Sequence, residues 1–198
     1  STAFVFRHNG KVLTFVEYNG AFYPQADVSD RLSGSPSTGW TYTSAANDEV
    51  ETYDTDGRLL SIRNRGGLTH TMAYDTDGRI TSVSDDFGRA LTFTYDAAAG
   101  TSNAVARVAS VANPSGGNYQ YGYAGANLTS VTYPDATVRQ YQYNGPTARA
   151  LTGIVDESSV TYATFAYNQF GEATLSTHAG GAGQVSISYV KGGVTNVG

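Results

Sequence analysis

The residues best suited to chemistry are closely spaced aspartates that precede a glycine and an arginine. One such segment is Asp54-Thr55-Asp56-Gly57-Arg58 and a second is Asp75-Thr76-Asp77-Gly78-Arg79. Carboxylates at alternate positions suit Ca²⁺, which makes a calcium site the functional alternative for these segments. An EF-hand loop begun at Asp54 would need glycine at its sixth position and an acid at its twelfth, where the chain has Leu59 and Arg65. We therefore favour turn chemistry over calcium binding and assign no metal ligand.

Other catalytic constellations lack their parts. The three histidines, at positions 8, 70 and 178, form no His-Glu-x-x-His pair, and the chain has no cysteine for a nucleophile or a thiolate zinc site. No Gly-x-Ser-x-Gly elbow and no Walker loop is present. The carboxylate pairs Asp85-Asp86 and Asp156-Glu157 fall in expected hairpin turns, where solvated side chains are the simpler interpretation. The sequence predicts a protein without catalysis and without a cofactor.

Aromatic side chains offer a binding chemistry instead. Exposed rings along a strand can stack on sugars, which makes Trp40 and the strip Tyr119, Tyr121 and Tyr123 the candidate ligand-stacking residues. The competing interpretation is that these rings pack in cross-strand ladders, with pairs worth about 0.2 to 1 kcal/mol each. We favour packing, and a surface-exposed module that binds carbohydrate or protein is the alternative function.

Charge and hydropathy exclude several partners. The chain of 198 residues has 12 Lys and Arg against 17 Asp and Glu, a formal charge of -5, which does not suit nucleic acid or an anionic membrane. No apolar stretch approaches 18 residues, so we expect no membrane insertion. The first residues, Ser1-Thr2-Ala3, do not begin a signal peptide, and the absence of an initial Met suggests a processed product or an excised fragment.

The elements that must position these residues are strands. Apolar and small polar residues alternate in Leu91 to Tyr95, in Tyr119 to Tyr123 and in Val185 to Tyr189, a period of two that predicts strands with one buried face. Pairs that tolerate positive φ lie between such runs and predict tight hairpins. These pairs are Asn9-Gly10, Asn19-Gly20, Asp56-Gly57, Asp77-Gly78, Gly116-Gly117 and Asn144-Gly145.

The hairpins repeat. Tyr53 to Leu59 returns 21 residues later as Tyr74 to Ile80, and Tyr95-Asp96 opens a third unit after another 21 residues. Later anchor tyrosines at positions 123, 143 and 167 mark looser copies. Repeats of this length indicate an array whose units cannot bury their faces alone. We predict a repeat array over residues 51–198, preceded by a less regular β lead-in over residues 1–50.

The repeat residues are assigned to architecture. Asp side chains can accept backbone N–H bonds in the turn, and glycine supplies the left-handed position. We expect Arg58 and Arg79 to reach the Asp or Tyr of a neighbouring hairpin, with the stem on a ring and the guanidinium on a carboxylate. The predicted fold is all-β, a curved antiparallel sheet of consecutive hairpins, with stability close to a sum of unit and neighbour contributions.

These motifs resemble the YD repeats of rearrangement hotspot (RHS) proteins. The resemblance is carried by Tyr53, Asp54, Gly57, Arg58, Tyr74, Asp75, Gly78, Arg79, Gly88, Arg89, Tyr95 and Asp96. It implies a segment of a spiral β shell, as in bacterial polymorphic toxins, toxin complex components and teneurins. In the bacterial relatives the shell encloses a toxin that is delivered to another cell, often by a type VI secretion machine. The resemblance thus implies a bacterial, secreted or delivered structural segment that protects a polypeptide cargo, partnered by the rest of the shell.

Two departures limit what the resemblance implies. The chain lacks the Asp-Pro-x-Gly signature of self-cleavage, its only Pro-Asp being Pro134-Asp135 in the reverse order, and it contains no toxin domain. We therefore transfer neither self-cleavage nor killing activity to it. Because an open sheet leaves edges and an aromatic face exposed, we expect self-association of the isolated chain through its sheet edges.

Overall fold

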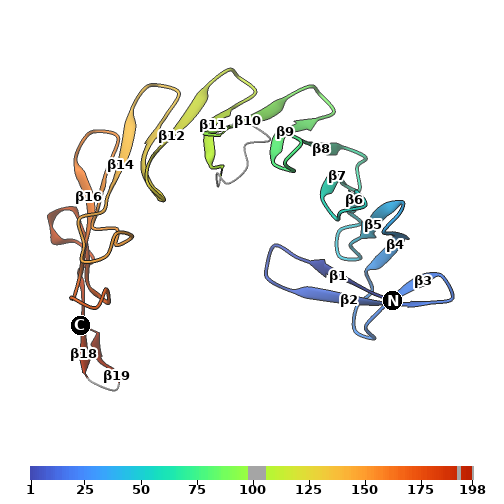
Figure 1. Ribbon diagram of the computed structural model, residues 1–198, viewed down its shortest axis with the longest axis horizontal. Helices are drawn as coiled ribbons and strands as arrows, with labels where there is room; N and C mark the ends of the chain where they lie inside the picture. The colour runs from blue at the N-terminus through green and yellow to red at the C-terminus, as the bar shows by residue number, and fades with distance from the viewer. Residues whose placement is uncertain (98–105, 191–192, 198) are drawn as a thin grey trace. The chain divides into compact units, whose positions relative to one another are not determined.

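The computed structural model describes residues 1–97, 106–190 and 193–197, with the backbone alone described at 190 and 193–197, and it is all-β (Figure 1). Besides a single 3-10 turn, η1, the described elements are strands. In chain order they are β1 (Thr2–Phe6), β2 (Val12–Tyr18), β3 (Ala21–Pro24), β4 (Arg31–Ser35), β5 (Gly39–Thr43), β6 (Val50–Tyr53), β7 (Leu59–Arg63), β8 (Thr69–Tyr74), β9 (Ile80–Asp85), β10 (Ala90–Tyr95), β11 (Val108–Ala112), β12 (Asn118–Ala124), β13 (Asn127–Thr132), β14 (Val138–Gln142), β15 (Gly153–Val155), β16 (Thr161–Tyr167), β17 (Ala173–His178), η1 (Ala179–Gly181), β18 (Val185–Val190) and β19 (Gly193–Val197). In the described part of the chain, no helix is long and apolar enough to cross a membrane.

Consecutive strands lie antiparallel beside one another from β1 to β10 and again from β11 to β19. Strand β10 is also a neighbour of β11 in the sheet. The turn at Asn19-Gly20 shows why: both residues have positive φ, 52° and 78°, and they join Tyr18 directly to its partner Ala21. The predicted all-β sheet of consecutive antiparallel hairpins is confirmed.

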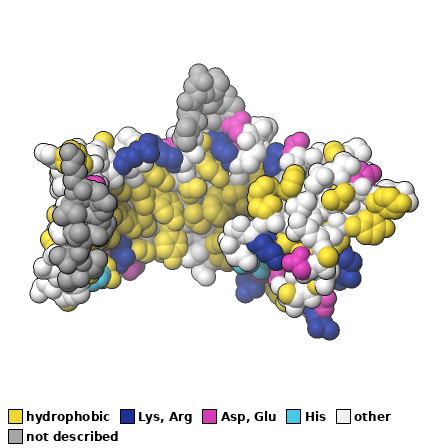
Figure 2. All heavy atoms as spheres, turned by 90° about the horizontal axis from the view of Figure 1, so that it is seen from below, with side chains coloured by type: hydrophobic (Ala, Val, Ile, Leu, Met, Phe, Trp, Pro, Cys, Tyr) yellow, Lys and Arg dark blue, Asp and Glu magenta, His cyan; other side chains and the backbone are white. Residues whose placement is uncertain are grey.

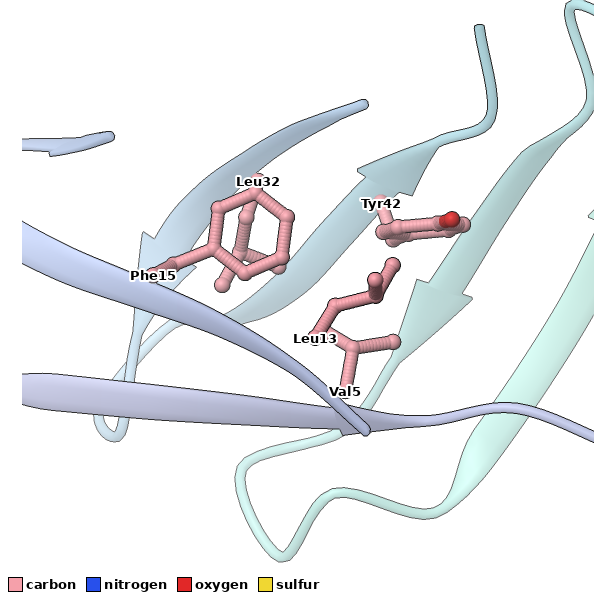
Figure 3. Close-up of a cluster of buried hydrophobic side chains, with 5 residues drawn as sticks. All are labelled: Val5, Leu13, Phe15, Leu32 and Tyr42. Atoms are coloured by element: carbon pink, nitrogen blue, oxygen red, sulfur yellow. The ribbon is translucent and has the colours of Figure 1, made fainter. Parts of the chain in front are cut away.

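The chain forms two compact units, residues 1–92 and residues 93–198. The first unit holds a small core of Val5, Leu13, Phe15, Leu32 and Tyr42 (Figure 3). Phe15 is 0% exposed and its ring meets the ring of Tyr42 edge-on at 6.5 Å. Strands β1 and β2 supply three of these side chains and β4 and β5 the other two, so the N-terminal hairpin packs over the strands that lead into the repeats.

Within the repeats of the first unit, the two faces of the sheet differ in chemistry. Met72, Val83 and Leu91 lie opposite one another on one face, because β8, β9 and β10 are in register. The other face carries small polar residues, such as Thr71 opposite Ser84, and cross-strand hydroxyl pairs such as Thr52 with Ser61 at 2.6 Å. The strict alternation of the sequence thus sorts into an apolar face and a hydroxyl face.

The second unit repeats this division. Tyr121 lies opposite Val131, and Tyr141 opposite Ile154, whereas Gln120 lies opposite Thr132 on the other face. In the described part of this unit only Val131, Ala150 and Ala163 are buried hydrophobic residues, so most apolar side chains are half-buried. Figure 2 shows hydrophobic side chains lying side by side over strands of the repeats on the side turned toward the viewer. The sheet is a single layer with an apolar surface.

One predicted hairpin is wrong. Asn144-Gly145 does not close a tight turn: β14 ends at Gln142, β15 begins at Gly153, and Gly145 is not among the residues with positive φ. A Cβ on Gly145 would lie 2.6 Å from the Cβ of Ala150, which is only 5% exposed. Glycine is needed here for the close approach of the loop to Ala150 rather than for a turn.

Candidate functional site

The repeat motif folds into a turn held by one carboxylate. Asp54 Oδ1 accepts hydrogen bonds from the backbone N–H groups of Asp56 at 3.0 Å and Arg58 at 2.8 Å. Its Oδ2 accepts a bond from Arg58 Nε at 2.6 Å. The backbone closes the same turn, because the Gly57 N–H donates to the Asp54 carbonyl at 3.2 Å. A single side chain therefore satisfies the turn amides and neutralises the arginine that follows.

The same turn recurs along the chain with Asp or Asn at its first position. Asp75 bonds to the N–H and Nε of Arg79 at 3.0 and 2.7 Å, and Asp85 bonds to those of Arg89 at 3.0 and 2.6 Å. Asp96 makes the same two bonds to the N–H and Nε of Arg107, at 2.8 and 2.7 Å, across a longer connection of which residues 98–105 lie outside the described part of the chain. Further versions without the arginine begin at Asn64, Asn113, Asp156 and Asn168. The turn is thus built at both ends of the strands. The sequence already indicated the copy at Tyr167-Asn168, whereas the copies at Asn64 and Asn113 were missed because the alignment used the Tyr-Asp pair.

Glycine fixes the shape of these turns. Gly57, Gly78 and Gly88 have φ of 83°, 76° and 75°, a conformation that a residue with a side chain rarely adopts. A Cβ on Gly78 would also lie 3.2 Å from the Arg58 guanidinium. The fourth position of the motif therefore requires glycine for its backbone conformation, and Gly78 also lies close to the Arg58 side chain, whereas Gly57 and Gly88 have open space around them.

The arginine connects its own turn to the next repeat. The sequence prediction placed Arg58 on the Asp or Tyr of a neighbouring hairpin. In the structure its guanidinium pairs with Asp54 of its own turn, and its Cζ lies 5.8 Å from the ring centre of Tyr74, which belongs to the next repeat. Arg107 repeats this arrangement on the Tyr123 ring at 4.3 Å. Each such arginine therefore bridges two successive repeats through a cation–π contact.

The repeat tyrosine completes the link. The Tyr74 hydroxyl donates to the Leu59 carbonyl at 2.7 Å, directly after the turn of the preceding repeat. The hydroxyls of three further tyrosines donate to carbonyls 15 or 16 residues earlier, and these pairs are Tyr123 with Val108, Tyr167 with Leu151 and Tyr189 with Ala173. We call these bonds the tyrosine latch. Tyr189 was missed because no Tyr-Asp pair marks it in the sequence.

The environment of the motif favours the charged form of its aspartates and the neutral form of its tyrosine. The backbone N–H of Arg58, with its side chain, lowers the pKa of Asp54, and the Arg89 side chain lowers the pKa of Asp85. Burial of Asp75 opposes its ionisation, yet the hydrogen bonds from Arg79 hold its pKa below the ordinary value. Burial raises the pKa of the Tyr74 phenol, which keeps the latch hydroxyl a donor. The turns are thus built of ionised acids and protonated phenols at neutral pH.

In these turns, the aspartate oxygens that a calcium ion would need are engaged by other groups of the protein. The Asp54 and Asp75 oxygens that would face a cation accept bonds from N–H groups and from arginine instead. Among the described residues, no three acidic or histidine side chains converge in a way that could hold a metal ion. The motif acts as a turn clamp in this structure.

A second polar cluster lies in the first unit, and sequence reasoning missed it. Arg7 makes two bonds to the Glu51 carboxylate, at 2.6 and 2.8 Å, and both side chains are largely buried. The Tyr53 hydroxyl also donates to Glu51, and the Arg7 guanidinium lies 4.5 Å from the ring centre of Tyr42. Although burial of Glu51 favours its neutral form, the bonds from Arg7 and Tyr53 lower its pKa. The cluster fastens the N-terminal hairpin to β6.

The first repeat tyrosine therefore has a different partner from its later copies. Tyr53 bonds to Glu51 rather than to a carbonyl of a preceding turn, and burial together with this bond raises its pKa. Tyr42 donates to Asp30 at 2.6 Å. No signal in the sequence linked Arg7 to Glu51, because they lie 44 residues apart and neither belongs to the repeat.

The candidate stacking residues are half-buried and engaged with protein groups. Trp40 packs edge-on against Phe22 at 5.2 Å, and Tyr119 against Tyr133 at 5.8 Å. Tyr121 lies opposite Val131 on the apolar face, and Tyr123 belongs to the latch. Trp40 belongs to the first unit and the tyrosine strip to the second. Ligand stacking at these positions stays a prediction.

The acidic pairs lie in turns but are bound there. Asp86 accepts a bond from the Thr69 N–H at 2.7 Å, and Glu157 pairs with Arg139 at 3.0 Å. Asp85 and Asp156 clamp their turns and are half-buried, so the expectation of solvated side chains is wrong for these two, whereas Asp86 is exposed as expected. The physical reason is that each turn supplies several free N–H groups, which a carboxylate satisfies better than water does at fixed geometry.

Comparison with known proteins gives one finding. The protein family described as Teneurin YD-shell matches residues 5–193 of the chain. A search of the curated proteins found no match.

Proposed function

Because the chain belongs to the teneurin YD-shell family, we propose that it is a non-catalytic wall segment of a shell that encloses and protects a polypeptide cargo. The observation that carries the proposal is the single-layer sheet with one apolar and one hydroxyl face. A wall needs two surfaces of different chemistry and a means of joining its units. The faces supply the first, and the tyrosine latch with its arginine supplies the second.

The apolar face is the surface proposed to meet the cargo. Val83 and Tyr121 are representative: each lies on the apolar face and is half-buried, with no second layer over the repeats in the described part of its unit. An apolar surface of this kind marks an interaction site in a folded protein. The cargo that fits the resemblance to RHS proteins is a polypeptide toxin, with delivery to another cell and a secretion machine as further parts of the proposal.

Protection of the cargo tests the proposal. The natural protein is digested with a protease under native conditions and again after unfolding in urea, and the surviving peptides are identified by mass spectrometry. The proposal expects a polypeptide outside the repeats that survives native digestion and is lost after unfolding. Complete native digestion of every segment outside the repeats would overturn it.

A matched pair of variants tests which face of the sheet meets the cargo. Val83 and Ser84 are neighbours in β9, both are partly exposed, and they lie on opposite faces. Val83→Lys is expected to lower cargo protection because it places a charge on the apolar face, whereas Ser84→Lys leaves it unchanged. Equal effects of the two variants at equal stability would remove the apolar face from the proposal.

A further inference from the structure

A cavity of about 380 Å³ lies on the hydroxyl face of the first unit, over strands β3, β4 and β5. Leu32 is buried in the core, so its neighbours Arg31 and Ser33 point to the opposite side of β4. Thr43 lies opposite Arg31 and Thr41 lies opposite Ser33, and all four residues line the cavity. The cavity therefore gathers one guanidinium and three hydroxyl groups.

Small residues keep this cavity open. Gly20, Ala21 and Gly34 belong to its lining and present little or no side chain. Gly34 cannot be larger, because its φ is 116° and a Cβ there would collide with the Gly39 carbonyl oxygen. The space beside the guanidinium and the hydroxyl groups is therefore left free by the residue types around it.

The guanidinium of the cavity has no counter-charge in the described part of the chain. None of the described acids pairs with Arg31, and the adjacent acid, Asp30, accepts bonds from the Tyr42 hydroxyl at 2.6 Å and from the Ala45 N–H at 2.8 Å. Most other arginines do pair with an acid, namely Arg7, Arg58, Arg65, Arg79, Arg89, Arg107 and Arg139. An unpaired cation that lines a cavity fits an anionic ligand.

The hydroxyl groups of the cavity are also available. Elsewhere on this face the hydroxyls bond across the strands, as Thr52 does with Ser61 at 2.6 Å. Those of Ser33, Thr41 and Thr43 make no hydrogen bond to another described side chain. Each hydroxyl can both donate and accept, which suits a ligand that itself carries several hydroxyl groups.

An exposed aromatic ring borders the cavity. Phe22 pairs with Leu32 and packs against the core, so the next residue of each strand, Tyr23 and Arg31, lie side by side on the hydroxyl face. The Tyr23 side chain is 54% exposed. A flat aromatic ring of this kind can stack on the C–H face of a sugar while its hydroxyl stays in water.

We propose that this cavity binds a sugar unit that carries a carboxylate, as in a uronic acid of an acidic polysaccharide. The planar guanidinium of Arg31 matches a carboxylate through two parallel hydrogen bonds. The three hydroxyl side chains bond to the hydroxyl groups of the sugar, and the Tyr23 ring stacks on one face of it. A neutral sugar would leave the cation unpaired, and a bare anion would leave the ring unused.

The net charge of the chain does not oppose this binding. The formal charge is -5, but salt screens exposed charges that lie more than about 10 Å apart, so the cation in the cavity decides the local preference. The proposal does not depend on the shell function, because it uses the hydroxyl face of the first unit alone.

Calorimetric titration of the full chain with trigalacturonate at neutral pH tests the proposal. The matched ligand is the fully methyl-esterified trigalacturonate, which has the same sugar rings without the charge. We expect saturable binding of trigalacturonate that weakens between about 0.1 M and 1 M salt. The ester is expected to bind at least about tenfold more weakly, because it loses the charge-assisted hydrogen bonds.

Variants of the cavity separate a built site from nonspecific attraction. Arg31→Gln is expected to weaken the binding of trigalacturonate at least about tenfold, and Tyr23→Thr is expected to weaken it as well. Arg149→Gln is the matched control, since Arg149 is exposed in the other unit and pairs with none of the described acids. It is expected to bind as the parent does. Urea midpoints verify that each variant folds.

Four results would overturn the proposal. The first is an absence of binding at millimolar trigalacturonate, and the second is equal binding of trigalacturonate and its methyl ester. The third is an equal loss of affinity in Arg31→Gln and Arg149→Gln. The fourth is binding of inorganic phosphate as tight as that of trigalacturonate, since the cavity would then hold a bare anion rather than a sugar.

Discussion

Replacing Tyr74 by phenylalanine removes one tyrosine latch and leaves the ring in place. The lost bond joins the Tyr74 hydroxyl to the Leu59 carbonyl at 2.7 Å, and both groups are partly buried. A neutral hydrogen bond contributes about 1 kcal/mol to stability, so we expect the free energy of unfolding to fall by about that amount. In a chain of this size, 1 kcal/mol corresponds to a fall in Tm of about 2–4 °C. The Arg58 contact with the ring should survive, because phenylalanine keeps the face on which the guanidinium lies.

The assay is urea unfolding followed by the emission of Trp40, which lies in the same unit as Tyr74. Tyr18→Phe is the matched control because Tyr18 is 68% exposed. Adding Arg58→Met to Tyr74→Leu in a double-mutant cycle measures the cation–π link between the repeats, expected at about 0.5–1 kcal/mol. An unchanged midpoint for Tyr74→Phe, or an equal loss for Tyr18→Phe, would refute the latch as a coupling between repeats.

Three further outcomes follow from the described contacts. Glu51→Gln should lower the free energy of unfolding by about 3–5 kcal/mol because it leaves Arg7 buried without its counter-charge. Urea midpoints measure this change, with Glu17→Gln at a more exposed position as the control. Equal losses of stability in the two variants would contradict the prediction. Gly78→Val should destabilise by at least about 1–2 kcal/mol, because valine is forced to positive φ, and by more than Gly66→Val, whose backbone has no such φ. Because Asp54, Asp75, Asp85 and Asp96 have lowered pKa values, their stabilisation is complete above the unfolded aspartate pKa of about 3.9 and is lost as the pH falls through the folded values. Unfolding between pH 7 and pH 3 should show this acid loss, and Asp85→Asn should make it smaller; an unaltered pH dependence in that variant would contradict the clamp.

The fold was predictable because its information is local and repeated. Alternation places Val83 and Ser84 on opposite faces, and the Asn19-Gly20 pair fixes its hairpin without help from distant residues. The turn motif could be read as architecture because Gly57 and Gly78 fall where a left-handed residue is needed.

The contacts between segments could not be read in the same way. The Arg7 to Glu51 pair joins residues far apart in the sequence, and neither residue has a pattern that names the other. Arg58 was expected to reach the Asp or Tyr of a neighbouring hairpin. Its contact with the Tyr74 ring agrees with this expectation, but its carboxylate partner is four residues away because the turn brings Asp54 back to it. Gly145 looked like a turn residue, although the close approach of Ala150 is what requires it. Sequence periodicity predicts strands, whereas contacts between loops cannot be predicted from it because they depend on the path of the folded backbone.

Small-angle scattering combined with light scattering on the natural protein tests the shell proposal most directly. A wall segment of a closed shell requires a particle with low density at its centre, so the distance distribution should be shifted toward long distances relative to a solid globule of the same mass. We predict that result, and we predict that Gly78→Val, which strains a repeat turn, shifts the distribution away from the parent's. A distance distribution that matches a solid globule of the measured mass would contradict the shell.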